Sequence, residues 1–452
     1  MKLTRKGCAI RIALGFFVLV GLAGYAFGQD ATIVGTILDP SSAAVPNVTI
    51  TVTNTDTGQV RHVSSSDVGQ YVVPDLQIGH YTIRAEAPGF KAAEQKDVKL
   101  NVADRARVDF KLEVGSTQES VNVEATAVAI QSESGEVSDV ITGQQVSQLA
   151  TNGRSIYSLA TLTAGASSNM VDFQNPVPVG GDGTVSFNGL RVSHNLYMVD
   201  GGEDYDRGGS GNISIMPSVD SIAEFRALTS NYSADYGLSS AGTLTMAFKS
   251  GTKDFHASAW EFLRNDALDA GNFFTNAAGA KAPELRFNTY GFNAGGPVII
   301  PKIYNNKDRD KTFFFYNMEW RKLVQGGLVN QTVPLPGEYG GQINTAIHVP
   351  NASQLSPTLQ AQYAALGLSP GQAFPNNTIP ASLLDPNAQV LLKAGIFPSP
   401  NNGAQFVGGN KLPTDVREEI VRVDHQFSDK FWIFGHWVDE RISQAYGTSQ
   451  WS

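Results

Sequence analysis

Hydrophobic and polar residues alternate one by one along several stretches of this chain. Between Gly242 and Lys249, the sequence GTLTMAFK places its leucine, methionine and phenylalanine on one side and its threonines and lysine on the other. Because successive side chains of a β-strand point to opposite faces, this segment is predicted to be a strand with one apolar and one polar face. Such a strand suits the boundary between lipid and a watery lumen, and it suits a half-buried sheet equally well.

The same alternation recurs in the second half of the chain. One face of Lys311–Lys322 (KTFFFYNMEWRK) is apolar, and the other carries Glu319 and Arg321. The first face suits lipid and the second a lumen, while Tyr316 and Trp320 suit the aromatic belt of a membrane surface. The segments predicted to be strands of this kind are Gly242–Ser250, Phe255–Arg264, Phe287–Ile300, Lys311–Lys322, and Val416–Arg441, the last as a hairpin.

Short strands separated by turn signals occupy the first part of the chain. Ile33–Ile37 is predicted to be a strand that ends at the turn Asp39-Pro40-Ser41, and Val48–Thr53 alternates in the same way. These signals predict a small β-sandwich. Tyr71 and Tyr81 lie at strand spacing, where aromatic residues are core residues more often than a sugar-stacking platform.

Helical signals appear further along the chain. Thr142 and Gln145 have the spacing of a capping box, which predicts a helix over Gly143–Leu149. A second helix is predicted for Ser155–Leu162, and Asn188-Gly189 predicts a tight turn between two strands. The mixture predicts an α+β domain in this part of the chain.

The first 28 residues have the layout of a secretory signal peptide. A basic start precedes the apolar run Ile12–Ala26, and small residues at Ala26 and Gly28 fit a cleavage site. An uncleaved membrane anchor is the alternative, although the apolar run is short for a spanning helix. The single cysteine, Cys8, lies inside this segment, so the mature chain is expected to have no disulfide and no cysteine-based metal site.

The charge balance is acidic. The chain has 33 Lys and Arg against 42 Asp and Glu, and removal of the four cations in residues 1–28 moves the net charge from −9 to −13. An acidic exported protein is a poor candidate for binding nucleic acid, so no nucleic-acid partner is expected. Since no later segment is apolar enough for a membrane helix, any membrane crossing is expected to use a closed β-barrel.

Several passages resemble one family. The stretch from Asn231 to Phe274, NYSADYGLSSAGTLTMAFKSGTKDFHASAWEFLRNDALDAGNFF, resembles the start of the barrel in TonB-dependent outer-membrane receptors of the Oar-like group. TNGRSIYSLATLTAG and SFNGLRVSHNLYMVDGG are similar to plug segments of that family. The residues whose spacing resembles a carboxypeptidase-regulatory-like domain are Asp67, Gly69, Tyr71, Leu76, Gly79, Tyr81, Gly89 and Phe90.

The resemblance implies a mainly β protein with several parts. These are a signal peptide at 1–28, a transthyretin-like or carbohydrate-binding-like β-sandwich at 29–114, a linker at 115–125, an α+β plug at 126–231, and the first strands of a transmembrane β-barrel at 232–452. The family's barrel has about 22 strands, and each strand needs about ten residues to cross. The chain is therefore expected to be the N-terminal part of a longer protein or the product of a truncated gene.

The sequence ESVNVEA in the linker resembles the TonB box of the family. An unpaired strand at this position would lend its backbone groups to the sheet of a periplasmic partner. The alternatives are the last strand of the sandwich and the first strand of the plug. The residues predicted to bind TonB are Glu119, Ser120, Val121, Asn122, Val123, Glu124 and Ala125.

The acidic loop DGGEDYD follows the predicted hairpin of the plug. Its oxygen-rich side chains suggest calcium, but an EF-hand loop would need an oxygen ligand where Gly208 stands, so no metal site is expected. A solvated plug loop is the simpler interpretation. Because plug apices of the family face the outside, the resemblance also makes the loop a candidate for ligand contact, through Asp200, Glu203, Asp204, Tyr205 and Asp206.

No catalytic pattern accompanies these features. The chain has no H-E-x-x-H, P-loop or Rossmann fingerprint, so no catalytic residue and no cofactor are expected. The resemblance implies a receptor that takes up a scarce substrate across the outer membrane with energy from TonB. Its expected partners are the periplasmic TonB complex, outer-membrane lipid, and a small-molecule, oligosaccharide or peptide substrate. The alternative is a surface adhesin or export-associated protein with a carbohydrate-binding-like module.

The stretch between Leu323 and Pro413 is rich in proline, glycine, asparagine and alanine. Long connections without clear strands are usually functional or disordered. In a receptor, this stretch would be an extracellular loop that contacts substrate.

Overall fold

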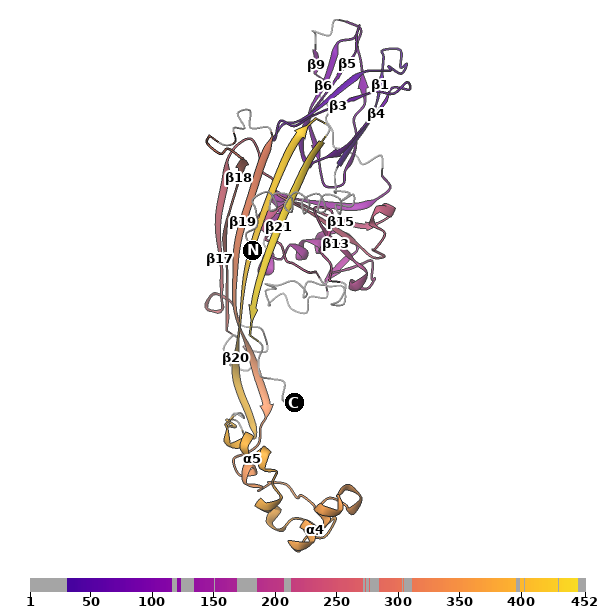
Figure 1. The fold of residues 1–452 in the computed structure, drawn as a ribbon. Helices are drawn as coiled ribbons and strands as arrows, with labels where there is room; N and C mark the ends of the chain where they lie inside the picture. The colour runs from indigo at the N-terminus through magenta and orange to yellow at the C-terminus, as the bar shows by residue number, and fades with distance from the viewer. Residues whose placement is uncertain are drawn as a thin grey trace, which may run out of the picture. The chain divides into compact units, whose positions relative to one another are not determined.

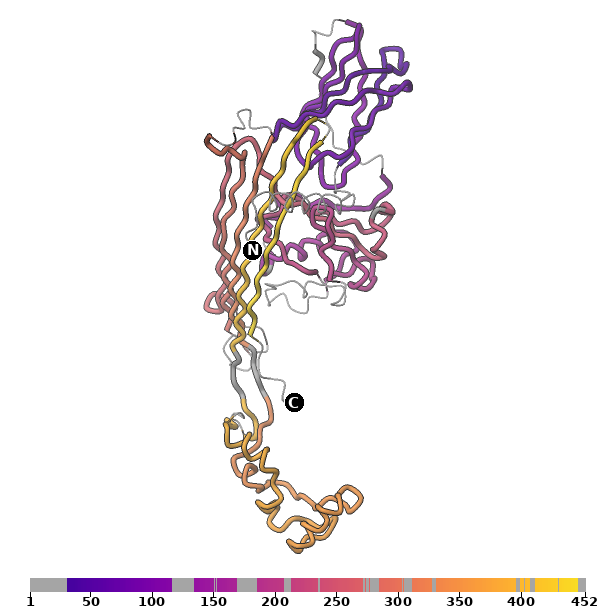
Figure 2. The backbone as a smooth tube through the Cα atoms, in the orientation of Figure 1, coloured from indigo at the N-terminus to yellow at the C-terminus, as the bar shows by residue number. Residues whose placement is uncertain are grey.

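The computed structural model forms two compact units (Figure 2). The larger consists of Met1–Leu263, Phe287–Leu323 and Thr414–Ser443, and the smaller of Arg264–Arg286, Val324–Pro413 and Gln444–Ser452. The predicted signal peptide lies outside the described residues. The structure describes residues 31–115, 120–122, 134–149, 151–168, 185–206, 213–270, 273, 276, 284–302, 304, 311–395, 399–401, 403–429 and 431–445.

Two β-sheets form a sandwich at the start of the larger unit (Figure 1). Alternating buried positions from both sheets, such as Ile33, Ile50 and Ile83, share one apolar core, as the sequence predicts. The first sheet contains β1 (Ala31–Leu38), β4 (Gln70–Leu76), β7 (Arg105–Arg107) and β8 (Phe110–Lys111). The second has the order β3 (Val60–Ser64), β2 (Thr49–Asn54), β5 (Gly79–Glu86), β6 (Ala92–Leu100), β9 (Ser120–Asn122).

The tyrosines of the sandwich are core residues. Tyr71 and Tyr81 are both buried, and the Tyr71 hydroxyl donates a hydrogen bond to the carbonyl oxygen of Val108 (2.7 Å). A Cβ atom on Gly35 would lie 1.8 Å from that carbonyl oxygen and 2.6 Å from the Tyr71 ring. Glycine is therefore needed at position 35 so that the two chain segments can approach closely. The core role predicted for the tyrosines is confirmed.

A five-stranded mixed sheet lies in the part of the chain predicted to be the plug, and the name plug is kept for this part. The strand order of the sheet is β10 (Val137–Thr142), β15 (Ile222–Ser230), β16 (Thr243–Phe248), β13 (Leu196–Val199), β14 (Gly202–Glu203), and β16 runs antiparallel to β15 and parallel to β13. The prediction that Gly242–Ser250 is the first barrel strand is wrong. Both faces of β16 are covered, since Thr243 and Thr245 are as fully buried as Leu244. The plug sheet thus extends past residue 231, and the other expected boundaries remain predictions.

Short helices and turns complete the plug. The predicted capping box is present: the backbone N–H of Thr142 donates to Oε1 of Gln145 (3.0 Å) at the start of α2 (Gly143–Gln148). The second predicted helix is a 3₁₀ helix, η2 (Ile156–Leu162). The other short elements are η1 (Asn152–Arg154), β11 (Ala166–Ser168), β12 (Val185–Phe187), η3 (Val192–His194), η4 (Val219–Ser221) and η5 (Ala234–Tyr236).

The predicted glycine turn connects other elements than expected. Asn188 and Gly189 both have positive φ, as a tight turn requires, but the preceding β12 pairs with β11 and not with the following strand. The hairpin of the plug is instead β13–β14, whose turn contains Asp200 and Gly201, also with positive φ. The Asn-Gly pair thus predicted the position of the turn correctly, but not which strands pair with each other.

Five strands form a meander, each hydrogen-bonded to the next along the chain (Figure 1). They are β17 (His256–Asn265), β18 (Leu285–Pro297), β19 (Thr312–Thr332), β20 (Gln405–Ser428) and β21 (Phe431–Gln444), with η6 (Asp266–Leu268) after β17. On the predicted polar face of β19, Glu319 and Arg321 are buried, while Trp320, on the opposite face, stacks on Tyr290 of β18 (5.4 Å between ring centroids). That these faces meet a lumen and lipid remains a prediction. Within the described part of the chain, no helix is long and apolar enough to span a membrane.

The smaller unit has a small core of its own. Val349, Leu368 and Phe374 are buried together, so the predicted long connection is folded over its described residues. Its helices are capped at their first turns by Ser356 and Asp385, each followed by proline. The elements are η7 (Glu338–Gly340), η8 (Ala352–Gln354), α4 (Pro357–Ala365), η9 (Pro375–Asn377), η10 (Ala381–Leu383) and α5 (Pro386–Lys393).

The close approach at Gly35 leads to a testable expectation. Gly35→Ala should lower the free energy of unfolding by roughly 1–3 kcal/mol, because the added methyl overlaps a backbone oxygen that cannot rotate away. Urea unfolding followed by proteolytic sensitivity of the sandwich measures the effect. Gly135→Ala, whose Cβ would meet nothing within 4 Å, is the control. Equal stability of the two variants would contradict the steric argument.

Candidate functional site

Several buried charged side chains lie on the face of the meander that packs against the plug. Arg321 of β19 lies among three carboxylates: its Nη2 is 2.6 Å from Oε2 of Glu418 and 3.4 Å from Oε2 of Glu440, and its Nε is 3.2 Å from Oε1 of Glu319. None of these four side chains is more than 4 % exposed. Strand alternation places Glu319 and Arg321 on one face, and β20 and β21 supply the other two acids. We call these four residues the Arg321 cluster.

The Arg321 cluster holds a short segment of the plug. Nη2 of Arg321 donates to the carbonyl oxygen of Met216 (2.8 Å). The backbone N–H of Ser218 donates to Oε1 of Glu418 (2.8 Å), and its hydroxyl donates to Oε2 of Glu319 (2.9 Å). Ser218 is also the N-cap of η4, so the same residue starts a helical turn and binds the strands. These bonds compensate part of the cost of removing the charges from water.

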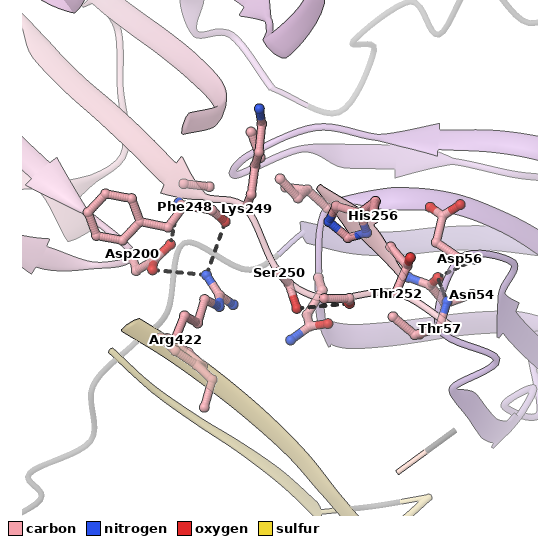
Figure 3. Close-up of a pocket in the computed structure, with 16 residues that line it drawn as sticks. Asn54, Asp56, Thr57, Asp200, Phe248, Lys249, Ser250, Thr252, His256 and Arg422 are labelled. Atoms are coloured by element: carbon pink, nitrogen blue, oxygen red, sulfur yellow. Dashed lines mark hydrogen bonds and ion pairs between the residues drawn. The ribbon is translucent and has the colours of Figure 1, made fainter. Parts of the chain in front are cut away.

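A second ion pair joins the plug to the strands. Nη1 of Arg422, on β20, lies 2.9 Å from Oδ2 of Asp200, which follows β13 (Figure 3). The other oxygen of Asp200 accepts a hydrogen bond from the backbone N–H of Phe248 at 3.1 Å (Figure 3). Asp424 also pairs with Arg422 (3.0 Å). These groups lie beside a cavity of about 250 Å³ that is lined by Asp200, Phe248, Lys249, Ser250, His256, Arg422 and residues of the sandwich turns.

The five predicted ligand-contact residues fall in different environments. The side chain of Asp200 is buried against Arg422. Asp204 is buried too, and accepts hydrogen bonds from the Tyr157 hydroxyl (2.8 Å) and the backbone N–H of Ile215 (2.9 Å).

Burial raises the pKa of Asp204, and the hydrogen bonds oppose this shift. The Tyr205 hydroxyl donates to the carbonyl oxygen of Ser193 (2.7 Å), while Glu203 and Asp206 are exposed. The acidic loop is thus partly built into the plug, and ligand contact by it remains a prediction. Among the described residues, no group of three or more histidines, cysteines or acids could hold a metal ion.

The predicted TonB-binding strand lies in the sandwich sheet where it is described. Ser120, Val121 and Asn122 form β9, which pairs in parallel with β6. Glu119 and residues 123–125 lie outside the described residues. These three residues therefore lie in the sandwich, which agrees with the alternative that they form its last strand. Binding to TonB remains a prediction.

A buried arginine joins the sandwich to the plug sheet. Arg226 of β15 is 1 % exposed, and its Nη1 donates to the carbonyl oxygen of Val102 (2.6 Å) and to Oδ1 of Asp104 (2.9 Å). Glu224, on the same strand, accepts a hydrogen bond from the backbone N–H of Val102 (3.3 Å). Burial raises the pKa of Glu224 to about 7, although Lys99 and the Val102 bond act in the opposite direction.

Sequence reasoning found only part of these sites. The face of β19 with Glu319 and Arg321 was identified, because the polar pair interrupts an aromatic strand. The partners Glu418, Glu440 and Met216 were missed, because they are distant in sequence and the pairing register of the strands was unknown. Arg226 was missed as well, since a single arginine in a strand carries no signal of its burial.

The structure thus combines a sandwich, a second sheet held by buried charges, and a meander of five strands. Residues 247–451 match the family described as outer membrane beta barrel domain, and residues 32–113 match the carboxypeptidase regulatory-like domain. The mainly β fold, the N-terminal regulatory-like domain and the outer-membrane location predicted from the sequence are confirmed.

The chain is 24 % identical over 310 residues to the TonB-dependent transporter Oar of Myxococcus xanthus, which confirms the predicted resemblance. This match covers 64 % of the chain and 28 % of that protein, so the chain spans little more than a quarter of its relative. Among solved structures, the outer membrane transporter YddB from Escherichia coli matches with a TM-score of 0.41 and 12 % identity, over 69 % of this chain and 34 % of that chain. The Bacillus anthracis TIE protein matches 18 % of this chain and 16 % of its own, with a TM-score of 0.16 and 19 % identity.

Removing the cation of the Arg321 cluster should release the plug. Arg321→Gln is expected to weaken the seating of the plug by about 3–5 kcal/mol, because three buried carboxylates lose the guanidinium they share. Cells that make this variant should become sensitive to vancomycin, which is too large to cross an intact outer membrane. Lys322→Gln, the next residue on β19 and half exposed, is the control. Unchanged vancomycin resistance in both variants would refute the proposed seating.

The buried Glu224 predicts a pH dependence of stability. Its pKa is raised from 4.5 to about 7, so the folded chain keeps a proton that the unfolded chain has released. Stability should therefore fall as the pH rises between about 4.5 and 7, by up to roughly 3 kcal/mol. In Glu224→Gln this component should be missing, as urea unfolding at several pH values would show. Glu203→Gln, at an exposed position of the plug, is the control. A Glu224→Gln profile with the slope of the wild type would contradict this expectation.

Proposed function

We propose that this protein is a TonB-dependent outer-membrane transporter that takes up a scarce substrate with energy delivered by TonB. The observation that supports the proposal best is the plug interface. Met216, Ser218 and Asp200 of the plug bind the strands through ion pairs and hydrogen bonds. Such contacts can be replaced by bonds to water at a small net cost, whereas separating a large apolar interface exposes all of its surface. A plug held in this way can leave its seat and return.

The transport cycle follows from these contacts. In the resting state, the Arg321 cluster and the Asp200–Arg422 pair keep the plug against the strands. Substrate, which is a small molecule, an oligosaccharide or a peptide, binds from outside. TonB pairs with the backbone of residues 119–125 by strand addition and pulls on the chain. The pull separates the ion pairs, water enters the charged interface, and the substrate passes into the periplasm.

The charged interface favours transport over adhesion. An adhesin would need its sandwich exposed, but it would need neither a releasable plug nor an energised partner. The buried carboxylates of the Arg321 cluster carry a large desolvation cost, which an immobile plug could avoid by packing apolar residues there. The comparison with Oar supports the same choice.

A proline in the predicted TonB-binding strand tests the proposal. Val121→Pro should abolish cross-linking to TonB in cells, because proline lacks the N–H that strand addition uses. Val121→Ile keeps that donor and should cross-link like the wild type. Normal cross-linking of Val121→Pro would show that this strand is not the TonB-binding strand.

Growth on a nutrient that requires the intact gene gives a second measurement. Deletion of residues 119–125 should abolish that growth if the protein is a transporter. Growth equal to the wild type would favour the adhesin.

A further inference from the structure

The strand predicted to bind TonB is part of a preformed sheet edge. β9 lies beside β6 (Figure 1). The two strands are parallel, with Ala92 opposite Ser120, Ala93 opposite Val121 and Glu94 opposite Asn122. On its other side β6 pairs with β5. Among the described strands, β9 has a neighbour on one side only, so it is the edge of a five-stranded sheet. A sheet edge of this kind is a template for an added strand.

We propose that TonB adds a strand to the outer edge of β9 while β9 stays paired with β6, so that the sandwich is part of the docking platform. This inference rests on the proposed function. It differs from the usual view of the strand as a free tail that becomes ordered only on binding. A strand already held in extended form loses less conformational freedom when the partner arrives, which favours association. The partner must therefore present an unpaired β-strand, whose backbone N–H and C=O groups pair with those of β9.

The platform is connected to the plug by the Arg226 contacts. β6 ends at Leu100, and the turn that follows contains Val102 and Asp104, the two residues that Arg226 binds. Glu224 binds the same turn. A partner docked on β9 is therefore linked through β6 to β15, the strand next to the edge strand β10 of the plug sheet. A pull on the sandwich reaches the plug through hydrogen bonds as well as through the chain.

A reversible disulfide between β6 and β9 tests whether the pair stays intact. In Ala93→Cys/Val121→Cys the two thiols occupy opposed positions of neighbouring strands, at a spacing that a disulfide can bridge. The only natural cysteine, Cys8, lies in the predicted signal peptide. Binding of the soluble C-terminal domain of TonB to the full chain is measured for the oxidised and the reduced protein. We expect affinities that agree within about twofold, since the outer edge of β9 is unchanged.

A loss of about tenfold or more on oxidation, restored by reduction, would overturn the inference. TonB would then have to take β9 away from β6. Thr51→Cys/His62→Cys joins β2 to β3 in the same sheet and should bind equally in both states. If the double substitution itself disturbs the strand, Glu94→Cys/Asn122→Cys repeats the test one residue further along. Failure of the wild-type chain to bind TonB at all would instead refute the proposed function.

Discussion

The structure depends on the way one arginine is shared among buried acids. Arg321 shares its guanidinium among Glu319, Glu418 and Glu440, and the plug completes the arrangement with a carbonyl oxygen, an N–H and a hydroxyl. Without the plug, these acids would face water; without the arginine, the plug would cover uncompensated charge. Seating of the plug and burial of the charged groups on the strands are therefore coupled. The same coupling explains why this face of β19 carries polar residues, which packing alone would not require.

Strands with alternating polar and apolar residues occur in three different environments in this chain. This alternation marks strands of the sandwich, of the plug sheet and of the meander, and in each of them the presence of strands was predictable. The assignment of a strand to its sheet was not, as β16 shows. Its threonines are as fully buried as its leucine and methionine, and the strand lies inside a sheet of five. Threonine suits buried strands because its methyl packs and its hydroxyl is small, so a threonine face does not indicate water.

The candidate sites were predictable to the extent that their signals are local. The capping box at Thr142 and the polar face of β19 depend on residues close in sequence, and both were found. The partners of Arg321, Arg422 and Arg226 on other strands and turns lie about a hundred residues or more away, where only strand register and domain docking bring them together. The acidic residues of the plug loop predicted its environment only in part. The loop was interpreted as solvated, yet the side chains of Asp200 and Asp204 are buried and accept hydrogen bonds.

The contact made by Arg226 has a consequence for how this architecture can evolve. Two of the groups that bind the sandwich, Arg226 and Glu224, reach the main chain of Val102, and every amino acid offers the same carbonyl oxygen and, proline apart, the same N–H. Asp104 adds a side chain to this junction. The outer surface of the sandwich can therefore diverge, or be exchanged for that of another module with a similar turn, without loss of these main-chain contacts.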